Sequence, residues 1–414
     1  MKKIYEFVAN NEIKIFYLIS AFCFILFIHY NKLYHYFGHH SFSSNFVDWE
    51  FIRGFAKCNI ENKNRFYDLS CDIMGRRVVY PPTWNYTPKI IYYFNSNFIF
   101  LLSIVSIFVL AAKFVTIKKI SHGILIFLIF SSPYFLYGYH RLNIDIIFLP
   151  ILFFSIYFLK NNRNVISSSI VVICSFLKIY PVALYALFFR DRKSFLILIS
   201  VSIFISILIL FFHFDEILIM LKNSDMAGGP GNGTFSGNNL FYFISKVFVD
   251  NTPEQNPIYI LLNLILLSLV YFLIPNQNFL GNNTKNLESL LFVAGFIILI
   301  FCFVTSYNIN YRLMYILFFL PLFFSNNFNN NKLNKKLSLI FLILFLCKGH
   351  INTFLGNISI LEYFDLIQTD IGSMFKSGTI YSYYLNLIDS FIQWVMVIIL
   401  LKIFKQNNFK KIIF

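Results

Sequence analysis

Long runs of apolar residues constrain this chain more than any other feature of its sequence. Hydrophobic residue types make up 58% of the 414 residues and charged types 13%, and the mean hydropathy is +0.67. A soluble domain carries about a quarter charged residues. So much apolar surface needs lipid as its solvent, which predicts an all-α polytopic membrane protein. The composition excludes cytosolic enzymes, nucleic-acid-binding proteins and disulfide-rich scaffolds.

The apolar runs predict about 11–12 membrane-entering helices in a single domain that covers residues 1–414. Several runs are short for a span, so their ends must include Tyr, Asn and Ser flanks. The runs lie roughly at 15–31, 90–112, 122–139, 144–159, 165–189, 194–213, 258–275, 288–305, 312–325, 337–350 and 384–404.

The net charge of +15 predicts a sidedness for these helices. Lys and Arg gather in cytoplasmic loops of membrane proteins, which places both termini inside a bacterial inner or plasma membrane. The first run follows Lys2, Lys3 and Lys14 but precedes no A-x-A-like site, so we expect a retained helix. Three long segments are then external, at 32–89, 214–257 and 351–383.

The run 165–189 has basic residues on both sides and the sequence Lys178-Ile179-Tyr180-Pro181 near its centre. Pro181 removes a backbone donor and disfavours a continuous helix. The run is therefore either one kinked span or a re-entrant helical hairpin. The hairpin leaves most later basic residues on the cytoplasmic side, and the positive-inside rule favours it.

Charged groups at membrane depth are costly and mark functional candidates. Lys178 lies deep in the apolar run and needs either a buried carboxylate or an anionic substrate as partner. In the turn 139–145, Arg141 either pairs with Asp145 four residues on or leaves Asp145 to Lys178. Arg312 begins another apolar run, where it either grips a phosphate or extends to the interface.

The first external segment contains a candidate catalytic carboxylate. Asn45 is a plausible N-cap, which places Asp48 in the first turn of a short helix. Val47, Phe51 and Phe55 recur at helical spacing, so this helix should lie along the membrane surface. The alternative is that Asp48 only complements the helix dipole.

The six cysteines include no CxxC pair, which gives zinc or iron–sulfur binding no support. Cys58 and Cys71 share the first external segment and are either bonded to each other or free thiols. No metal-ligand set such as DxD appears, so we expect no cofactor, although a divalent metal stays possible.

Four short motifs together resemble the GT-C superfamily of polytopic glycosyltransferases, and most of all the family 87 mannosyltransferases. They are the first-loop Asp, VYPP at 79–82, RLNID at 141–145 and LKIYP at 177–181. The segments FSGNNLFYFI at 235–244 and YNINYRL at 307–313 also fall where that family has polar external motifs. The resemblance covers about residues 40 to 325, and no motif matches beyond it.

The resemblance implies transfer of a hexose such as mannose from a polyprenyl-phosphate donor to a glycan or glycolipid acceptor, with inversion. Asp48 would act as general base, and Lys178, Arg141 and Arg312 would neutralise the donor phosphate. Further candidate substrate-binding residues are Glu50, Tyr80, Asn143, Asp145, Tyr180 and Asn238. The expected partners are therefore the donor, the acceptor and membrane lipids, without nucleic acid or nucleotide.

Three alternatives belong to other classes or other reactions. A transporter or flippase of lipid-linked oligosaccharide typically shows internal repeats, and none is visible here. A Wzy-like polymerase of surface polysaccharide would rely on arginines in later external loops, whereas the arginines of this chain are mostly early or cytoplasmic. A purely structural membrane protein is the third alternative.

Overall fold

The computed structural model describes residues 12–31, 33, 46–72, 75–78, 80–117, 119–189, 191–224, 234–248, 257–275, 286–305, 308–357 and 377–413. The first part of the chain contains α2 (Glu12–Tyr30), α3 (Val47–Ile60), η2 (Leu69–Cys71), η3 (Pro82–Tyr86), η4 (Lys89–Tyr93), α4 (Ser96–Phe114), α5 (Ile120–Phe130), α6 (Pro133–Arg141), α7 (Ile144–Lys160), α8 (Asn164–Leu177), η5 (Tyr180–Phe188), α9 (Arg192–Phe212) and α10 (Phe214–Ser224). The second part contains β1 (Thr234–Phe235), α11 (Asn238–Phe248), α12 (Pro257–Leu273), α13 (Leu287–Thr305), β2 (Asn308–Ile309), η7 (Asn310–Phe318), α14 (Leu320–Phe323), α15 (Asn326–Asn329), α16 (Lys332–Asn357), α18 (Ser377–Gln406) and α19 (Lys410–Ile413).

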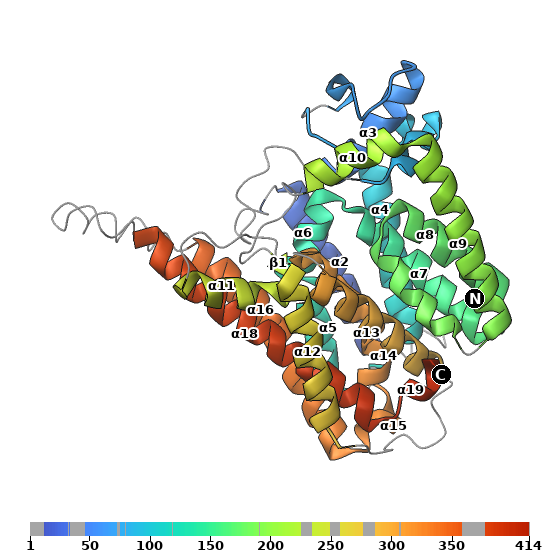
Figure 1. Ribbon diagram of the computed structural model, residues 1–414. Helices are drawn as coiled ribbons and strands as arrows, with labels where there is room; N and C mark the ends of the chain where they lie inside the picture. Colours follow the sequence, from blue (N-terminus) through green and yellow to red (C-terminus); the bar gives the residue numbers. More distant parts are fainter. Residues whose placement is uncertain are drawn as a thin grey trace, which may run out of the picture.

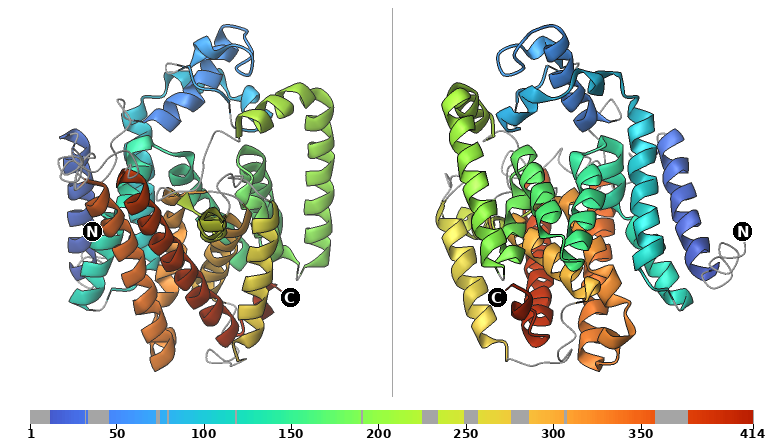
Figure 2. Two further views of the ribbon diagram at one scale, coloured as in Figure 1. Left: turned by 60° about the vertical axis from the view of Figure 1, so that its left-hand side comes forward. Right: turned by 90° about the vertical axis from the view of Figure 1, so that its right-hand side faces the viewer.

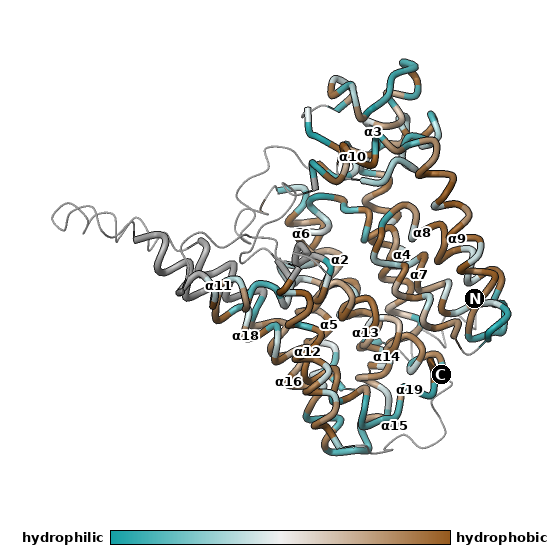
Figure 3. The backbone as a smooth tube through the Cα atoms, viewed as in Figure 1, coloured by the Kyte–Doolittle hydropathy of each residue, from teal (hydrophilic) through white to brown (hydrophobic). Residues whose placement is uncertain are grey.

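The described residues form an all-α bundle with one small strand pair, as the sequence predicts for the fold class. Five helices are long and apolar enough to cross a membrane, and a bent pair of helices gives a sixth candidate. Several long apolar helices are consistent with a multi-pass membrane protein. The hydropathy colours show the apolar residues running along the bundle helices, and the more polar chain gathers at their ends (Figure 3).

Proline sets where the bundle helices break. Pro133 begins α6 after a two-residue gap, and α5 and α6 meet at 42°. Pro181 lies in the first turn of η5, where its missing N–H leaves no helical bond unmade. The residues 178–179 therefore separate α8 from η5, which pack against each other.

The first external segment of the sequence prediction lies over one end of the bundle. Helix α3 and the short helices η3 and η4 pack together there (Figures 1 and 2). Helix α9 runs along the edge of the bundle, and α10 turns from its end toward α3. Asn64 donates a hydrogen bond of 2.8 Å to Glu216 of α10, which ties the two regions together.

A short antiparallel strand pair joins two segments of the second part of the chain. Thr234 of β1 lies opposite Ile309 of β2, immediately before η7. Helices α16 and α18 lie on the side of the bundle away from α9 (Figures 1 and 2). The strand pair therefore fixes the start of η7, the element that carries Arg312.

Two of the predicted external segments are described only in part. In the segment 214–257 the structure describes α10, β1 and α11, and in the segment 351–383 it describes the end of α16 and the start of α18. Most of the glycine-rich stretch 227–238 lies outside the described residues.

Candidate functional site

The Asp48 carboxylate is buried between the start of α3 and the end of α6. Arg141 grips both of its oxygens, with Nε 2.9 Å from Oδ2 and Nη2 2.6 Å from Oδ1. The amide of Asn143 donates a further hydrogen bond to Oδ2. The Asp48 side chain is 8% exposed and that of Arg141 is 12% exposed, so little water screens this bidentate ion pair.

Helix α3 begins at Val47, and Asp48 stands in its first turn as predicted. The N-cap position is held by Phe46 in a left-handed conformation with φ of 64°, and no side chain caps the helix. The predicted N-cap, Asn45, lies outside the described residues. Asp48 is therefore committed to Arg141 and Asn143 and does not cap its own helix.

A second ion-pair group braces the start of α3 from the following loop. Arg76 donates from Nη2 to the carbonyl oxygen of Val47 at 2.7 Å and pairs through Nε with Asp72 at 3.0 Å. Arg65 lies 3.3 Å from the same carboxylate. Burial raises the pKa of Asp72, but the hydrogen bonds and charge of Arg76, with the charge of Arg65, outweigh it and hold that pKa below its usual range.

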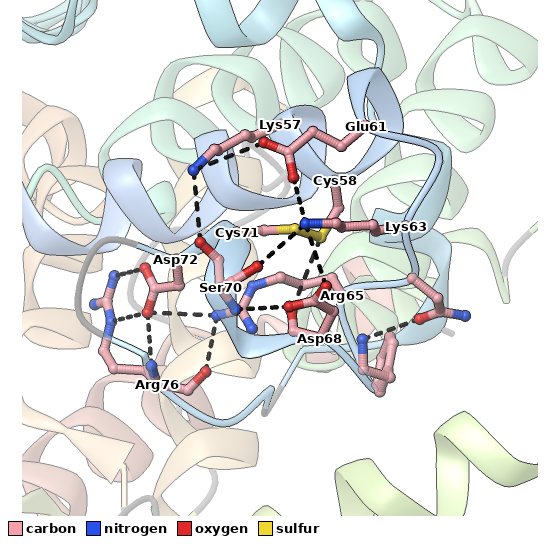
Figure 4. Close-up of a disulfide and its surroundings, with 12 residues drawn as sticks. Lys57, Cys58, Glu61, Lys63, Arg65, Asp68, Ser70, Cys71, Asp72 and Arg76 are labelled. Atoms are coloured by element: carbon pink, nitrogen blue, oxygen red, sulfur yellow. Dashed lines mark hydrogen bonds and ion pairs between the residues drawn. A yellow bond between two sulfur atoms is a disulfide. The ribbon is translucent and has the colours of Figure 1, made fainter.

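A disulfide between Cys58 and Cys71 joins the end of α3 to this loop (Figure 4). The sequence left open whether these two thiols are bonded, and the structure has them bonded. Disulfides persist in oxidising compartments, so the bond agrees with an external position for the segment. Because the same loop carries Asp72 and Arg76, the bond also helps to fix the backbone beside Asp48.

The turn between α6 and α7 decides which charges meet. Leu142 adopts a left-handed conformation with φ of 46°. Asn143 then caps α7, accepting a hydrogen bond of 3.0 Å from the backbone N–H of Asp145. Arg141 consequently pairs with Asp48, and Asp145 pairs with Lys178, so the predicted alternative of an Arg141–Asp145 pair does not form.

Lys178 lies at the break between α8 and η5, and 6% of it is exposed. Its Nζ is 2.8 Å from Asp145 Oδ1 and 3.2 Å from Asn143 Oδ1. Two side chains of η3 hold the break itself. Trp84 Nε1 donates to the Leu177 carbonyl at 2.9 Å, and Thr83 Oγ1 donates to the carbonyl of Phe176 at 2.5 Å.

Two further side chains complete the surroundings of Asp145. Tyr180 donates to Asp145 Oδ1, and its hydroxyl lies 2.6 Å from that of Tyr315. Arg312 enters from η7, with Nε 3.9 Å from Asp145 Oδ2 and the guanidinium over the Tyr180 ring. Arg312 therefore faces Asp145 and the Tyr180 ring.

We call this connected group the Asp48 cluster. Asn143 joins its two halves, because its amide donates to Asp48 and its carbonyl oxygen accepts from Lys178. Three cationic side chains face two carboxylates within it. Such an arrangement favours an added anion over an added cation. Its members are Asp48, Arg141, Asn143, Asp145, Lys178, Tyr180 and Arg312.

Three predicted site residues take other places. Glu50 pairs with Arg53 at 2.8 Å and accepts from Ser96 at 2.6 Å, so it anchors α3 to the start of α4. The ring of Tyr80 faces the Lys178 ammonium at 5.9 Å. Asn238 is buried near β1 and accepts a hydrogen bond from Asn263, in the second half of the chain.

Sequence reasoning missed two tyrosines and one buried ion pair. Tyr315 is described above, and Tyr137 Oη accepts a hydrogen bond of 3.2 Å from Arg141. With 26 tyrosines in the chain, neither stood out. Lys348 of α16 lies 2.7 Å and 2.8 Å from the two oxygens of Asp389 on α18. Each is a lone charge within an apolar run, which was the available signal.

We call Lys348 and Asp389 the C-terminal ion pair. Gln393 donates to Asp389 at 2.7 Å and accepts from the backbone N–H of Ser236 at 2.8 Å. Lys348 is fully buried and Asp389 is 3% exposed. The pair thus connects α16, α18 and the end of β1 in the interior of the second half.

Among the described residues, no group of three His, Cys, Asp or Glu side chains is placed to hold a metal ion. Comparison with protein-family models, with curated proteins and with solved structures found no match. The chemistry of the site therefore has to be argued from its own geometry.

Proposed function

We propose that this chain is a membrane glycosyltransferase. It would move a hexose such as mannose from a polyprenyl-phosphate donor to a lipid-linked or cell-surface glycan on the external face, with inversion. The observation that carries the proposal is the Asp48 cluster, in which one carboxylate of the first loop is connected to three cations at the end of the bundle. A phosphate and a sugar hydroxyl need these two kinds of group side by side.

The proposed topology has about 11–12 membrane-entering helices in a GT-C-like arrangement, with residues 165–189 as a re-entrant hairpin. Both termini would be cytoplasmic in a bacterial inner or plasma membrane. The disulfide of the first loop supports an external position for Asp48. A lipid-linked donor keeps its phosphate at the membrane interface, which is where such a loop meets it.

In the proposed reaction Asp48 takes the proton of an acceptor hydroxyl as that oxygen attacks the anomeric carbon. The bond from this carbon to the phosphate oxygen breaks on the opposite side, and polyprenyl phosphate leaves with one additional negative charge. Lys178 and Arg312 stabilise this charge. Each good charge-assisted contact supplies about 1.5–3 kcal/mol.

The bidentate Arg141–Asp48 pair adds a condition to this reaction. Arg141 holds both oxygens of Asp48 and Asn143 donates to one of them, so an acceptor hydroxyl would reach the carboxylate once Arg141 turns away. The donor phosphate is the natural competitor for the guanidinium. Donor binding would then place the sugar and also separate Arg141 from Asp48. Without donor, Asp48 would stay paired with Arg141.

The test is to incubate the purified protein in liposomes with a panel of polyprenyl-phosphate sugars and candidate acceptors, and to identify products by mass spectrometry. Asp48→Asn should lower the transfer rate by about 10²-fold or more, because a general base contributes about 10²–10⁴-fold. Glu50→Gln is the matched control in the same helical turn and should retain transfer. Full activity of Asp48→Asn would exclude Asp48 as base.

The same liposomes separate the proposal from its alternatives. A flippase or transporter would move labelled lipid-linked sugar between leaflets without forming a glycosidic bond. A polysaccharide polymerase would lengthen a lipid-linked oligosaccharide by whole repeat units, whereas the proposed enzyme adds single sugars. Donor binding by Asp48→Asn, measured in parallel, shows that the variant is folded.

A further inference from the structure

A cavity lies at the end of α7 that is distant from the Asp48 cluster. Its volume is about 680 Å³, within the range of about 300–1,000 Å³ that small-ligand sites have. The turn between α7 and α8, the end of η5, the first turn of α13 and the short helix α19 all contribute to its wall. The lining residues used below are Leu159, Lys160, Asn162, Asn164, Phe188 and Asp191.

This cavity and the Asp48 cluster lie at opposite ends of the same helices. Asp145 stands at the start of α7 and Lys160 at its end, and the 17 residues of this helix span about 25 Å. Helix α8 runs back from Asn164 and ends just before Lys178 of the cluster. The hydrocarbon core of a bilayer is about 30 Å thick. With the first loop outside, the cavity therefore lies where the cytoplasmic leaflet meets water.

Part of the cavity wall is apolar and close to the lipid-facing surface. Leu159, Phe188 and Ile412 supply apolar side chains to it. Helices α8 and α9 pack against each other beside it, and they carry Val165, which is 76% exposed, and Leu196, which is 63% exposed. In a membrane such exposed apolar side chains lie against lipid tails. A ligand in the cavity can therefore combine a polar group with a hydrocarbon chain.

The polar part of the wall offers hydrogen-bond donors. Within the described part of the chain, the Lys160 ammonium and the Asn162 amide make no side-chain hydrogen bond or ion pair. The carboxylate of Asp191 is already engaged as the N-cap of α9. It accepts from Asn164 Nδ2 at 2.7 Å and from the backbone N–H and hydroxyl of Ser194. Lys160 and Asn162 therefore remain available to the oxygens of a phosphate.

Cations outnumber carboxylates around the cavity. Basic side chains that line it, or lie within two residues of a lining residue in the chain, are all exposed and have no ion-pair partner among the described residues. They are Lys160, Arg163, Arg192, Lys193, Lys410 and Lys411. In the first external segment, by contrast, Arg53, Lys63 and Arg76 each pair with a carboxylate. A phosphate at the cavity would therefore be attracted by cations that no described carboxylate neutralises.

We propose that this cavity binds the headgroup of an anionic phospholipid of the cytoplasmic leaflet, of the phosphatidylglycerol type. Its phosphate contacts Lys160 and Asn162, and its acyl chains pass over the exposed apolar side chains of α8 and α9. A free phosphate ion would leave the apolar wall unused, and a zwitterionic lipid would bring a further cation among the basic side chains. The inference goes beyond the proposed function, because this lipid takes no part in sugar transfer.

Native mass spectrometry of the full-length protein measures this binding directly. The detergent-solubilised protein is titrated with phosphatidylglycerol and, separately, with phosphatidylcholine that has the same acyl chains. We expect saturable binding of one phosphatidylglycerol molecule, at least about fivefold tighter than that of phosphatidylcholine, because the charge difference is felt by unpaired cations. Equal affinity for the two lipids would overturn the proposal.

A pair of matched lysine variants locates the phosphate. Lys160→Gln should weaken phosphatidylglycerol binding by about fivefold, the effect of removing one cation at the membrane surface. Lys336 of α16 is also exposed and has no partner among the described residues, but it does not line the cavity. Lys336→Gln should therefore keep the parent affinity. An equal loss in the two variants would show that only the total charge matters and would overturn the site.

A second pair of variants tests the cavity without a change of charge. Leu159 lines the cavity and is partly buried, whereas Val165 is exposed and does not line it. Leu159→Trp should fill the cavity and abolish the preference for phosphatidylglycerol, and Val165→Trp should retain it. Thermal unfolding in phosphatidylcholine shows whether each variant is folded. If Leu159→Trp does not fold, the two lysine variants decide the question.

A competition experiment separates a lipid site from a site for a free anion. Inorganic phosphate is added to the parent protein already loaded with phosphatidylglycerol. We expect the lipid to stay bound at phosphate concentrations far above its own, because the apolar wall contributes to lipid binding alone. Displacement at comparable concentrations would identify a free-phosphate site and would overturn the assignment to a lipid.

Discussion

The two halves of the chain each bury charged groups among apolar helices, but they arrange them differently. The C-terminal ion pair matches one lysine to one carboxylate, and Gln393 occupies a carboxylate oxygen as well. The Asp48 cluster sets three cations against two carboxylates. A charge-matched pair fixes helices in place, whereas a group with more cations than carboxylates among the described residues is suited to receive an anion.

Exposure supports the same distinction. Both members of the C-terminal ion pair are 3% exposed or less. In the Asp48 cluster, Arg141 is 12% exposed and Arg312 is 19% exposed, whereas Asp145 between them is fully buried. Asp145 is thus the buried centre of the group, whereas Arg141 and Arg312 are partly exposed and could contact a ligand.

The largest expected effect is on stability, at the C-terminal ion pair. Lys348→Met leaves Asp389 as a buried charge without its cation and should lower the free energy of unfolding by about 3–5 kcal/mol. Transfer per folded molecule should be unchanged. Thermal unfolding of the detergent-solubilised protein measures the first quantity, and active-fraction-corrected turnover measures the second.

The double variant Lys348→Met/Asp389→Leu is the control for that prediction. It removes both charges, so most of the lost stability should return. If Lys348→Met instead abolished transfer in fully folded protein, the contrast between a structural pair and a functional cluster would fail.

The next effect concerns the disulfide that braces α3. Replacing Cys58 and Cys71 by serine opens a loop closed across 13 residues. We expect a stability loss of about 2–4 kcal/mol. Transfer should fall as well, because the loop holds Arg76 against the backbone beside Asp48. The matched control is Cys23→Ser/Cys347→Ser, two exposed free cysteines that should change neither quantity.

A smaller free energy is expected at Lys178, but it should appear in catalysis. Lys178→Met should lower kcat/KM for the donor by about 10–100-fold, the equivalent of one charge-assisted contact of about 1.5–3 kcal/mol. Its stability loss should be less than that of Lys348→Met, since Arg312 still faces Asp145. Steady-state kinetics with donor varied at saturating acceptor measures the effect. An unchanged kcat/KM would remove Lys178 from the phosphate site.

The smallest effect is a pH dependence at Asp72. Its folded-state pKa lies below its usual value, so its stabilisation is present above the unfolded pKa of about 3.9 and is lost as pH falls through the folded one. The stability difference between the parent and Asp72→Asn should therefore be largest near neutral pH and shrink below about pH 4. Unfolding midpoints across this range measure it, and a constant difference would contradict the assigned cause.

The sequence predicted the members of the Asp48 cluster better than their pairing. Arg141 and Lys178 stood out because charge near an apolar run is costly. Asp48 stood out because Asn45 as N-cap would place it in the first turn of a short helix. Their partners depended on the left-handed turn at Leu142, which sends Arg141 to α3 and Asp145 to the break at Lys178. No local pattern encodes that choice.

The bundle itself was predictable in class and less so in detail. Apolar runs of sufficient length predict helices, and Pro181 predicts the break before η5. The same run does not predict that the second piece is a 3₁₀ helix, which packs against α8 and α13. The bonded state of Cys58 and Cys71 likewise depends on how α3 and η2 meet in space.

Helix α9 gives the outer loop an unusual support. Only 6% of its most apolar stretch is buried by the rest of the protein, so in a membrane most of its surface would lie against fatty-acid chains. Its 21 residues span roughly 31 Å, close to the thickness of that layer. Since α10 at its upper end holds Asn64 and, through Asn223, the carbonyl of Val78, a thicker or thinner bilayer pulls on the segment that carries Asp48.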